Sequence, residues 1–410
     1  MHMTEMAPSL RFNSFVSNYF TNQLEDNLDL ITYGFTNPMP TVDDGEYFLI
    51  TARDLKDNKI NYHTARKTTK DAYNNLLSDK SRPLKGDILL SKDGTLGRVA
   101  VVDRSNICVN QSVAVLRTSL DVNQDYLLHI LSSPKYQKIM LSNAGGSSIK
   151  HIYITVVNKM KIRIPSVEEQ QKIASFLSSV DEKISQLEKK KTLLETYKRG
   201  IMQKIFSQEL RFKDENGEEF AEWEKLSIGD VCKLQGGYAF KSEKFDLTGI
   251  PIIRISNLGS NKKLDTENLV YYDKIDNDDN FIVRKNDLLI AMSGATTGKS
   301  AVCDFDDVAY LNQRVGLFRS KGGKLFYPFL VQFVFSVFFE RQLKPFLVSG
   351  AQPNISSKDI ECIKIKIPEI REQQKIASFL SSIDKKIEIT STQLEKTREF
   401  KKGLLQQMFV

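Results

Sequence analysis

The spacing of apolar residues changes twice along the chain, and in the same way each time. Two stretches, 1–165 and 208–368, contain short apolar runs such as RVAVV and PIIRI between glycine turns. Such runs are typical of β-strands, and a helical stretch near the end of each predicts an α+β domain. The stretches 166–207 and 369–410 instead repeat apolar residues every three or four positions. The pattern therefore predicts four parts in the order domain, long helix, domain, long helix.

Each predicted long helix carries one apolar stripe with the alternating spacing of a coiled coil. The stripe holds positions 173, 177, 180, 184, 187, 191, 194, 198, 201 and 205 in the first helix and 376, 380, 383, 387, 390, 394, 397, 401, 404 and 408 in the second. Lysines interrupt it at 191 and 198. Because the stripes are similar and equally long, we expect the helices to pair antiparallel, with an approximate twofold axis between the halves. The alternative is that each helix packs only on its own domain.

An internal repeat supports this division into halves. The sequence EQQKIASFLSS occurs at Glu169–Ser179 and again at Glu372–Ser382, a separation of 203 residues (372 minus 169). KIRIP before the first helix corresponds to KIKIP before the second, and SLRF near the N-terminus resembles ELRF after the first helix. Each half therefore begins just after the place where a long helix would end.

Composition narrows the classes of protein that fit. The net charge of +7 and pI of about 8.9 suit a surface that meets phosphates without requiring one. Four separated cysteines and four unclustered histidines predict a reducing cytoplasm and no structural zinc. No secretion signal is recognisable at the N-terminus. The most apolar stretch, 325–339, is interrupted by Pro328 and Gln332 and is too short to span a membrane, so we expect a buried helix and no membrane partner.

With this layout the chain resembles the specificity subunit of type I restriction-modification systems over essentially its whole length. The second half carries LQGGYAFKSEKF, GIPIIRISNL, KNDLLIAMSGATTGKSA, GAQPNI and IKIPEIREQQKIASFL. The first half carries KGDILLSKDGTLGRVAVV, GGSSI and IRIPSVEEQQKIASFL, with TYGF at Thr32 as a loose substitute for GGYAF. The resemblance implies an α+β fold with two pseudo-repeated α/β target-recognition domains and two long helices that pair as an antiparallel coiled coil.

The resemblance also implies partners and the absence of catalysis. Subunits of this family bind double-stranded DNA and two modification subunits, which use S-adenosylmethionine to methylate adenine N6. They can also recruit two restriction subunits. We therefore expect this chain to bind no cofactor of its own and to have no catalytic centre.

Polar loops bordered by glycines are the candidates for contacts with DNA, because strand-connecting loops present donors and acceptors on a rigid frame. The predicted DNA-binding residues are Lys92, Asp93, Thr95, Arg98, Ser147, Ser148, Lys150, His151, Tyr238, Phe240, Lys241, Ser293, Thr296, Thr297, Lys299, Gln352 and Asn354. A solvated turn is the structural alternative for each of them. The pairs Asn110-Gln111 and Asn312-Gln313 suit adenine, but their apolar neighbours favour a structural role.

The long helices are the predicted docking surface for the modification subunits. The side chains that we expect to be exposed there are Glu169, Gln170, Lys172, Glu372, Gln373 and Lys375. Helices of about 40 residues would separate the domain attachment points by roughly 55 to 60 Å, which exceeds one turn of B-DNA. We therefore expect a split, asymmetric target with a gap that is not read.

Three rival interpretations are weaker. SGATTGKS at 293–300 lacks the first glycine of a phosphate loop, and the following residues predict a strand instead of a helix. NPMP at 37–40 differs from the N-P-P-aromatic motif of adenine methyltransferases at its last two positions. A coiled-coil scaffold without DNA binding is the alternative function; it explains the helices but not the two elaborate domains.

Overall fold

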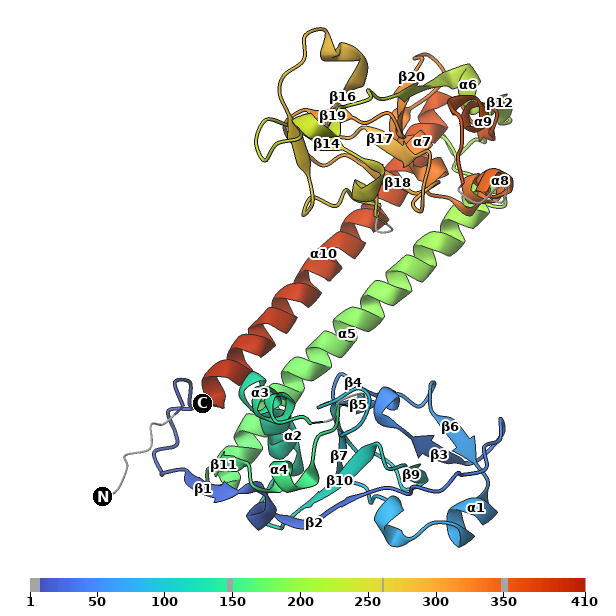
Figure 1. Cartoon of the computed structure of the whole chain (residues 1–410). Helices are drawn as coiled ribbons and strands as arrows, with labels where there is room; N and C mark the ends of the chain where they lie inside the picture. The colour runs from blue at the N-terminus through green and yellow to red at the C-terminus, as the bar shows by residue number, and fades with distance from the viewer. Residues whose placement is uncertain (1–7, 146–149, 260–261, 348–352, 410) are drawn as a thin grey trace. The chain divides into compact units, whose positions relative to one another are not determined.

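The computed structural model describes residues 8–145, 150–259, 262–347 and 353–409, which form two compact units (Figure 1). Unit 1 contains residues 1–189 and 391–410, and unit 2 contains residues 190–390. The long helices α5 (Val167–Phe206) and α10 (Ile370–Met408) each contribute one part to each unit.

Unit 1 contains two larger sheets, beside the two-stranded pairs β1-β11 and β4-β5. An antiparallel sheet has the order β2-β10-β7-β8, and a second sheet has the order β6-β3-β9, in which β3 is parallel to β9. Every residue of β7 is buried, because both faces of the strand are covered: Ile88 and Leu90 pack in one apolar cluster and Leu89 packs in another. The strands are β1 (Phe20–Gln23), β2 (Leu28–Tyr33), β3 (Tyr47–Ile50), β4 (Leu55–Lys56), β5 (Lys59–Ile60), β6 (Arg66–Thr68), β7 (Ile88–Ser91), β8 (Val99–Val101), β9 (Ile107–Val109), β10 (Val113–Thr118) and β11 (Lys161–Ile164).

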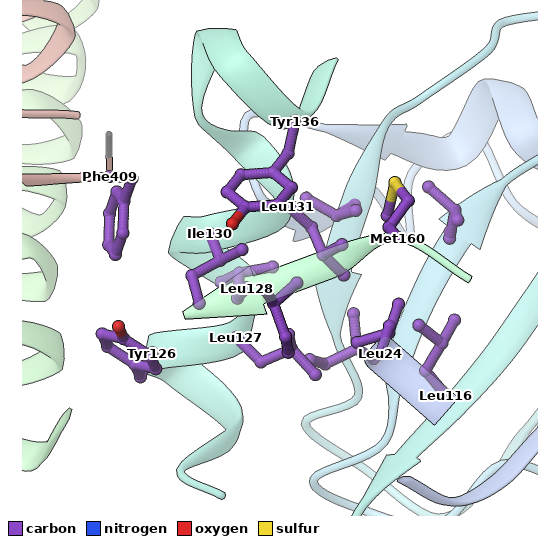
Figure 2. Close-up of a cluster of buried hydrophobic side chains, with 14 of the residues drawn as sticks. Leu24, Leu116, Tyr126, Leu127, Leu128, Ile130, Leu131, Tyr136, Met160 and Phe409 are labelled. Carbon is purple, nitrogen blue, oxygen red and sulfur yellow. The ribbon is translucent and has the colours of Figure 1, made fainter. Parts of the chain in front are cut away.

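Short helices complete unit 1. They are α1 (Lys70–Asn75), α2 (Gln124–Ser132), α3 (Pro134–Ser142) and α4 (Ile154–Asn158), with 3-10 turns at Leu24–Asn27, Ala52–Asp54 and Asp79–Ser81. Helix α2 begins where the side chain of Asn123 accepts hydrogen bonds from the backbone of Asp125 and Tyr126. Figure 2 shows the apolar side chains of α2 between the long helices and the sheet, with Tyr126 beside Phe409.

Unit 2 repeats this plan. Its four-stranded sheets have the orders β13-β20-β17-β18 and β15-β14-β19-β16, and β14 is parallel to β19 as β3 is to β9. Strand β12 pairs with β21, as β1 does with β11. The strands are β12 (Glu224–Ser227), β13 (Cys232–Gly236), β14 (Ile250–Ile253), β15 (Val270–Tyr272), β16 (Ile282–Val283), β17 (Leu288–Ala291), β18 (Ser300–Val302), β19 (Ala309–Leu311), β20 (Val315–Ser320) and β21 (Lys364–Ile367). The helices are α6 (Ile228–Val231), α7 (Tyr327–Val334), α8 (Val337–Leu347) and α9 (Ser357–Glu361), with 3-10 turns at Ser242–Lys244, Ile255–Asn257 and Asp278–Phe281.

The α+β fold with two repeated domains is thereby confirmed. The prediction of one helix over the apolar stretch 325–339 was wrong. The stretch contains α7, which ends at Val334, and the start of α8 at Val337. Its apolar side chains are buried or half-buried, and Phe329, Phe333 and Phe339 are among the buried ones. Within the described residues, no helix is long and apolar enough to cross a membrane.

The long helices run antiparallel within each unit. In unit 1, Asp181 pairs with Lys401 at 2.5 Å and Glu188 pairs with Arg398 at 2.6 Å, so residue numbers rise along α5 as they fall along α10. In unit 2, Lys198 pairs with Asp384 at 2.5 Å. Lys198 and Lys401 occupy the predicted stripe, and the positions of the stripe are buried or half-buried. The coiled-coil prediction is therefore confirmed, and the lysines at 198 and 401 are explained by carboxylates on the facing helix.

The same aromatic contact joins a long helix to a domain in both units. Phe409, the residue after α10, meets Tyr126 of α2 with ring centroids 5.6 Å apart, and Phe206 of α5 meets Phe329 of α7 at the same distance. Both pairs are separated by 203 residues from their counterparts (409 minus 206, and 329 minus 126). The repeat found in the sequence is thus also a repeat of packing. The domain boundaries 1–165, 166–207, 208–368 and 369–410 stay predictions.

Candidate nucleic-acid interface

The start of each long helix is held by a buried carboxylate. Glu169 accepts two hydrogen bonds from Arg11, from Nε at 2.8 Å and from Nη2 at 2.6 Å, and Glu372 accepts equivalent bonds from Arg211 at 3.3 and 2.8 Å. Tyr19 also donates to Glu169 at 3.0 Å. Both carboxylate side chains are fully buried. The prediction that Glu169 and Glu372 are exposed docking groups is therefore wrong, because bidentate arginines from the SLRF and ELRF segments cover them.

The glutamines that follow are buried for a related reason. Gln170 accepts a hydrogen bond from the backbone N–H of Asn123 at 2.9 Å, and Gln373 accepts one from Phe326 at 2.8 Å. Their amide groups donate to the carbonyls of Pro165 and Pro368 at 3.1 and 2.8 Å. The prediction of exposure is wrong for these two as well. Each glutamine ties the first turn of a long helix to the strand before it and to the start of α2 or α7.

The two lysines of the predicted docking surface behave differently. Lys172 is exposed, with its ammonium 5.8 Å from the centre of the Phe12 ring. Lys375 is half-buried and donates to the carbonyl of Lys213 at 2.8 Å. Only Lys172 therefore keeps the solvent-facing position expected of the whole set.

In unit 1 the structure brings the two predicted DNA-binding loops together. His151 forms an antiparallel bridge with Asp93, and the backbone N–H of Ile152 donates to the carbonyl of Lys92 at 2.8 Å. The carboxylate of Asp93 joins the side chains, with His151 Nδ1 at 2.6 Å and Lys92 Nζ at 2.8 Å. Lys150 is exposed beside them. Ser147 and Ser148 lie outside the described residues.

The rest of the first loop is positioned less tightly. Arg98 is exposed, and its guanidinium donates to the carbonyl of Leu55 at 3.0 Å. Thr95 is half-buried. Gly97 adopts a positive φ of 78°, which favours glycine at this turn. The loop is therefore a turn with polar side chains at its rim, as the sequence predicted.

In unit 2 the corresponding loops meet in the same way. Ser293 bridges Asn354, and the backbone N–H of Ile355 donates to the carbonyl of Met292 at 2.8 Å. Asn354 and Lys299 are exposed. Gln352 lies outside the described residues. The pairing of these loops, which are distant in the sequence, is thus a shared feature of the two units.

Two threonines of this loop have already used their donors. The hydroxyl of Thr296 donates to the carbonyl of Ile255 at 2.9 Å, and that of Thr297 donates to the carbonyl of Gly294 at 2.5 Å. A phosphate accepts hydrogen bonds but donates none, so these hydroxyls are poor phosphate ligands in this conformation. Ser293 also points inward, since its buried Oγ has no partner within the described structure.

The GGYAF element divides into a buried and an exposed part. Phe240 is only 8% exposed and lies in the core of unit 2, so its assignment to a DNA-facing loop was wrong: its ring packs among Tyr238, Phe281 and Tyr310. Tyr238 remains 45% exposed, and Lys241 is exposed.

The TYGF segment of the first half is the structural equivalent of GGYAF, which the sequence indicated only loosely. Tyr238 bridges Asn312, and Phe35 of the TYGF segment bridges Asn110 in the same parallel sense. The preceding glycine approaches the backbone so closely in both units that a Cβ would lie 1.8 Å from the carbonyl oxygen of Val109, or 2.1 Å from that of Leu311. A glycine followed by an aromatic residue is the signal that could have aligned these segments.

The asparagine and the glutamine of the Asn-Gln pairs have different environments. The side chain of Asn110 accepts hydrogen bonds from the hydroxyl of Ser112 at 2.6 Å and from its backbone N–H at 3.2 Å, which closes the turn between β9 and β10. The structural interpretation is therefore confirmed for Asn110. Gln111 and Gln313, by contrast, are exposed.

The segment 293–300 leads directly into a strand. Lys299 is followed by β18 (Ser300–Val302), which pairs with β17, whereas a phosphate loop leads into a helix. Among the described residues no group of histidine, cysteine, aspartate and glutamate side chains is arranged to hold a metal ion.

Comparison with known proteins identifies the repeated frame. The family model of the type I restriction modification DNA specificity domain matches residues 40–196 and 221–397, one match in each half. The chain belongs to this family.

Relatives within the specificity-domain family agree with this assignment. The type I restriction enzyme MjaVIII specificity subunit of Methanocaldococcus jannaschii is 28% identical over 331 residues, which cover 78% of this chain and 77% of the relative. The EcoAI specificity subunit of Escherichia coli is 29% identical over 167 residues, which cover 39% of this chain and 28% of that subunit.

Solved structures share the fold. The S subunit of a type I restriction-modification system from M. genitalium superposes with a TM-score of 0.65 at 17% identity and 99% coverage of both chains. A chain from a structure of a type I system that concerns complex assembly and conformational transition gives a TM-score of 0.54 at 15% identity, covering 96% of this chain and 97% of that chain. The family match and the similar subunits identify the chain as a type I DNA specificity subunit, in a family whose members are not the catalytic subunits of their systems.

Proposed function

We propose that this specificity subunit binds a split, asymmetric double-stranded DNA target, with each unit reading one half-site. The observation that carries the proposal is that the two units share the same fold but have different side chains in their loops. The helix-entry contacts of Glu169 and Glu372 correspond, whereas the loops around Asp93 and Ser293 present different side chains on the same bridge. A constant scaffold with variable loops suits recognition of two dissimilar sequences.

The long helices set the gap between the half-sites in this proposal. Both helices belong to both units, and paired charges on facing helices occur in each. A paired helix keeps its length at about 1.5 Å per residue and cannot stretch without losing its hydrogen bonds. The gap is therefore expected to be constant in length and free in sequence.

Chemistry at the target falls to partner subunits. Two modification subunits would bring S-adenosylmethionine and methylate adenine N6, and two restriction subunits can join where the system encodes them. Methylation of a base in a duplex requires that the base leave the stack. Because the chain acts on DNA beside these enzymes, its place of action in the proposal is the cytoplasm.

The docking surface for the modification subunits needs revision, because four of the six residues first considered are buried. Tyr197 of α5 and Phe400 of α10 occupy equivalent positions in the repeat and are 53% and 55% exposed. The next residue in each case, Lys198 or Lys401, turns inward to its carboxylate. Large exposed aromatic residues are frequent anchors of protein interfaces. Their repetition supplies one equivalent anchor per unit, together with Lys172.

Mapping of N6-methyladenine by long-read sequencing tests the recognition role. Cells that express the chain with its modification subunit are compared with cells that lack only the chain. The proposal predicts a split, asymmetric methylated motif that disappears without the chain. Methylation that does not depend on the chain, or salt-insensitive or absent DNA binding, would instead favour a coiled-coil scaffold.

Insertion of one heptad into both long helices tests the role of the helices. Seven residues add about 10 Å, which is close to three base pairs of B-DNA. The expected result is a longer gap between unchanged half-sites, or loss of binding. An unchanged gap would show that the helices do not set the spacing.

Substitution of the exposed aromatic residues tests the docking surface. Tyr197→Ser and Phe400→Ser are each expected to remove one modification subunit from the assembly, and the double variant to remove both. Native mass spectrometry of the purified complex gives the count. Leu120→Ser, at a fully exposed leucine outside the helices, is the control. Full occupancy in the double variant would refute this surface.

A further inference from the structure

A polar pocket in unit 1 lies beside the predicted DNA-binding loops. It has a volume of about 500 Å³ and is formed by the segment after β2, the 3-10 turn at Ala52–Asp54, strand β6 and the turn between β9 and β10. The side chains that give it its chemistry are Asn37, Thr51, Arg53, Arg66 and Gln111.

The charge of this pocket is positive. Two arginines line it, and no carboxylate is among the described residues of its wall. Asp54, the residue after Arg53, is buried, and its Oδ1 lies 3.9 Å from Arg53 Nε. Oδ2 of Asp54 is occupied by the backbone N–H and hydroxyl of Thr51. In the described structure no hydrogen bond or ion pair engages the guanidinium of the exposed Arg66, which therefore remains available to hydrogen-bond acceptors of a ligand.

A second cavity of unit 1 differs from this pocket because carboxylates lie among its cations. It has a similar volume, about 520 Å³, but Asp57, Asp181 and Glu188 line it together with lysines and an arginine. Two of those acids are paired with Lys401 and Arg398 of α10. Part of the positive charge of that cavity is therefore balanced by carboxylates of its own wall, whereas no carboxylate lines the pocket with Arg66 among the described residues.

The pocket continues into the DNA-facing loops. The turn at its edge accepts hydrogen bonds at the carbonyl of Ser112 from the backbone N–H groups of Lys92 and Asp93, at 2.9 and 3.3 Å. The backbone N–H of Gln111 donates to the carbonyl of Phe35 at 2.8 Å, which fixes the turn on the opposite wall. Gln111 is therefore held by its backbone while its exposed side chain stays free to meet a ligand.

We propose that this pocket reads base edges of the first half-site, with Gln111 and Arg66 as the residues that determine specificity. The inference rests on the proposed function. A glutamine amide offers the donor and acceptor that match adenine N7 and N6, and an arginine fork matches guanine O6 and N7 in the major groove. Asn37 and Arg53 extend the same donor surface. Asn110 takes no part, because its amide closes the turn.

The experiment compares the methylated motifs of variants in cells that contain the modification subunit. Gln111→Ala removes the amide, and Arg66→Lys keeps the charge but removes the fork. Asn18→Ala and Lys138→Ala change exposed residues of the same unit and serve as controls.

The expected result is a loss of base discrimination of roughly 5- to 150-fold at one adenine position for Gln111→Ala and at one guanine position for Arg66→Lys. Both positions fall in the same half of the motif, and the other half is unchanged. Wild-type motifs in both variants would overturn the inference, and so would a uniform fall in methylation without relaxed sequence, which indicates phosphate contacts alone. A wild-type chain that directs no split motif would overturn the proposed function itself.

Discussion

Units 1 and 2 hold the start of a long helix with corresponding residues, but the residues around these contacts differ. Glu169 and Glu372 both accept a bidentate arginine, but the additional donor is Tyr19 in unit 1 and Trp223 in unit 2. The helix entry requires a hydrogen-bond donor that reaches the carboxylate, and two different aromatic residues supply it. The comparison teaches that the repeat preserves contacts more strictly than residue types.

A sharper difference lies where each domain meets the paired helices. Gln332 of α7 donates to Asp384 at 3.1 Å, so this aspartate binds both Gln332 and Lys198. The equivalent of Gln332 in unit 1 is His129, which is buried and has no hydrogen-bond partner at either ring nitrogen in the described structure. Asp181 therefore depends on Lys401 more than Asp384 depends on Lys198.

The largest expected effect comes from the helix entries. Glu169→Ala and Glu372→Ala each leave a partly buried arginine without its partner, which costs about 3–5 kcal/mol of unfolding free energy. Denaturant unfolding with hydrogen exchange would measure the loss and locate it in unit 1 or unit 2. Glu169→Gln and Glu372→Gln, which keep an acceptor, should lose less. Losses below about 1 kcal/mol would contradict the equivalence of these contacts.

The next effect tests the ion pairs between the helices. Lys401→Ala leaves Asp181, whose side chain is 25% exposed, without its ion-pair partner. Lys198→Ala leaves Asp384, whose side chain is 45% exposed, with the hydrogen bond from the amide of Gln332. We expect Lys401→Ala to be more destabilising by about 1 kcal/mol, the net value of one hydrogen bond. Denaturant midpoints of both variants, with Lys190→Ala as an exposed control, give the comparison. An equal or reversed order would show that Gln332 does not support Asp384.

A smaller effect depends on pH. Burial, with a lesser contribution from the charge of Lys401, lowers the pKa of His129 from 6.5 to about 3. Above pH 6.5 the ring is neutral in both states and contributes no pH dependence. As pH falls from 6.5 towards 3, only the unfolded chain gains the proton, so unit 1 loses up to about 1.4 kcal/mol per pH unit.

His129→Gln should remove that dependence and place in unit 1 the residue found at the equivalent position of unit 2. Unfolding followed at pH 7.5 and 5.5 measures it. The wild-type chain should lose more stability over this interval than the variant by about 1.4 kcal/mol. The same loss in both proteins would mean that His129 is not the responsible group.

The smallest expected effect concerns phosphate contacts. Lys150 and Lys299 are exposed beside equivalent loops of the two units. If each meets a phosphate, Lys150→Ala and Lys299→Ala should each reduce the salt dependence of DNA binding by about one unit of slope and leave the motif unchanged. Binding titrations at several salt concentrations measure the slope, and Lys138→Ala is the control. A slope unchanged in one variant would show that the two units meet the backbone differently.

Much of the fold could be predicted from the chain because its signals are local or periodic. The stripe from Ile173 to Ile205 predicted the coiled coil, and the repeat of EQQKIASFLSS predicted the equivalence of the halves. The loops around Lys92 and Ser293 were found from glycines, which mark turns by their own backbone freedom. The candidate site was harder, since its surface joins segments that are far apart in sequence, such as Phe35 with Asn110.

The sequence by itself determined the alternation of strands and helices and the family, and it favoured antiparallel pairing of the long helices over packing of each helix on its own domain. It could not determine which polar residues face water. Glu169 and Gln170 stand in a polar run at a helix start, which resembles a solvated face until Arg11, 158 residues away from Glu169, closes over it. Phe240 was expected in an exposed loop and is buried. Gln111 was expected to have a structural role, and its side chain is exposed. Periodicity is a property of neighbouring residues, whereas burial depends on what the rest of the chain brings to a surface, and only the tertiary structure decided that.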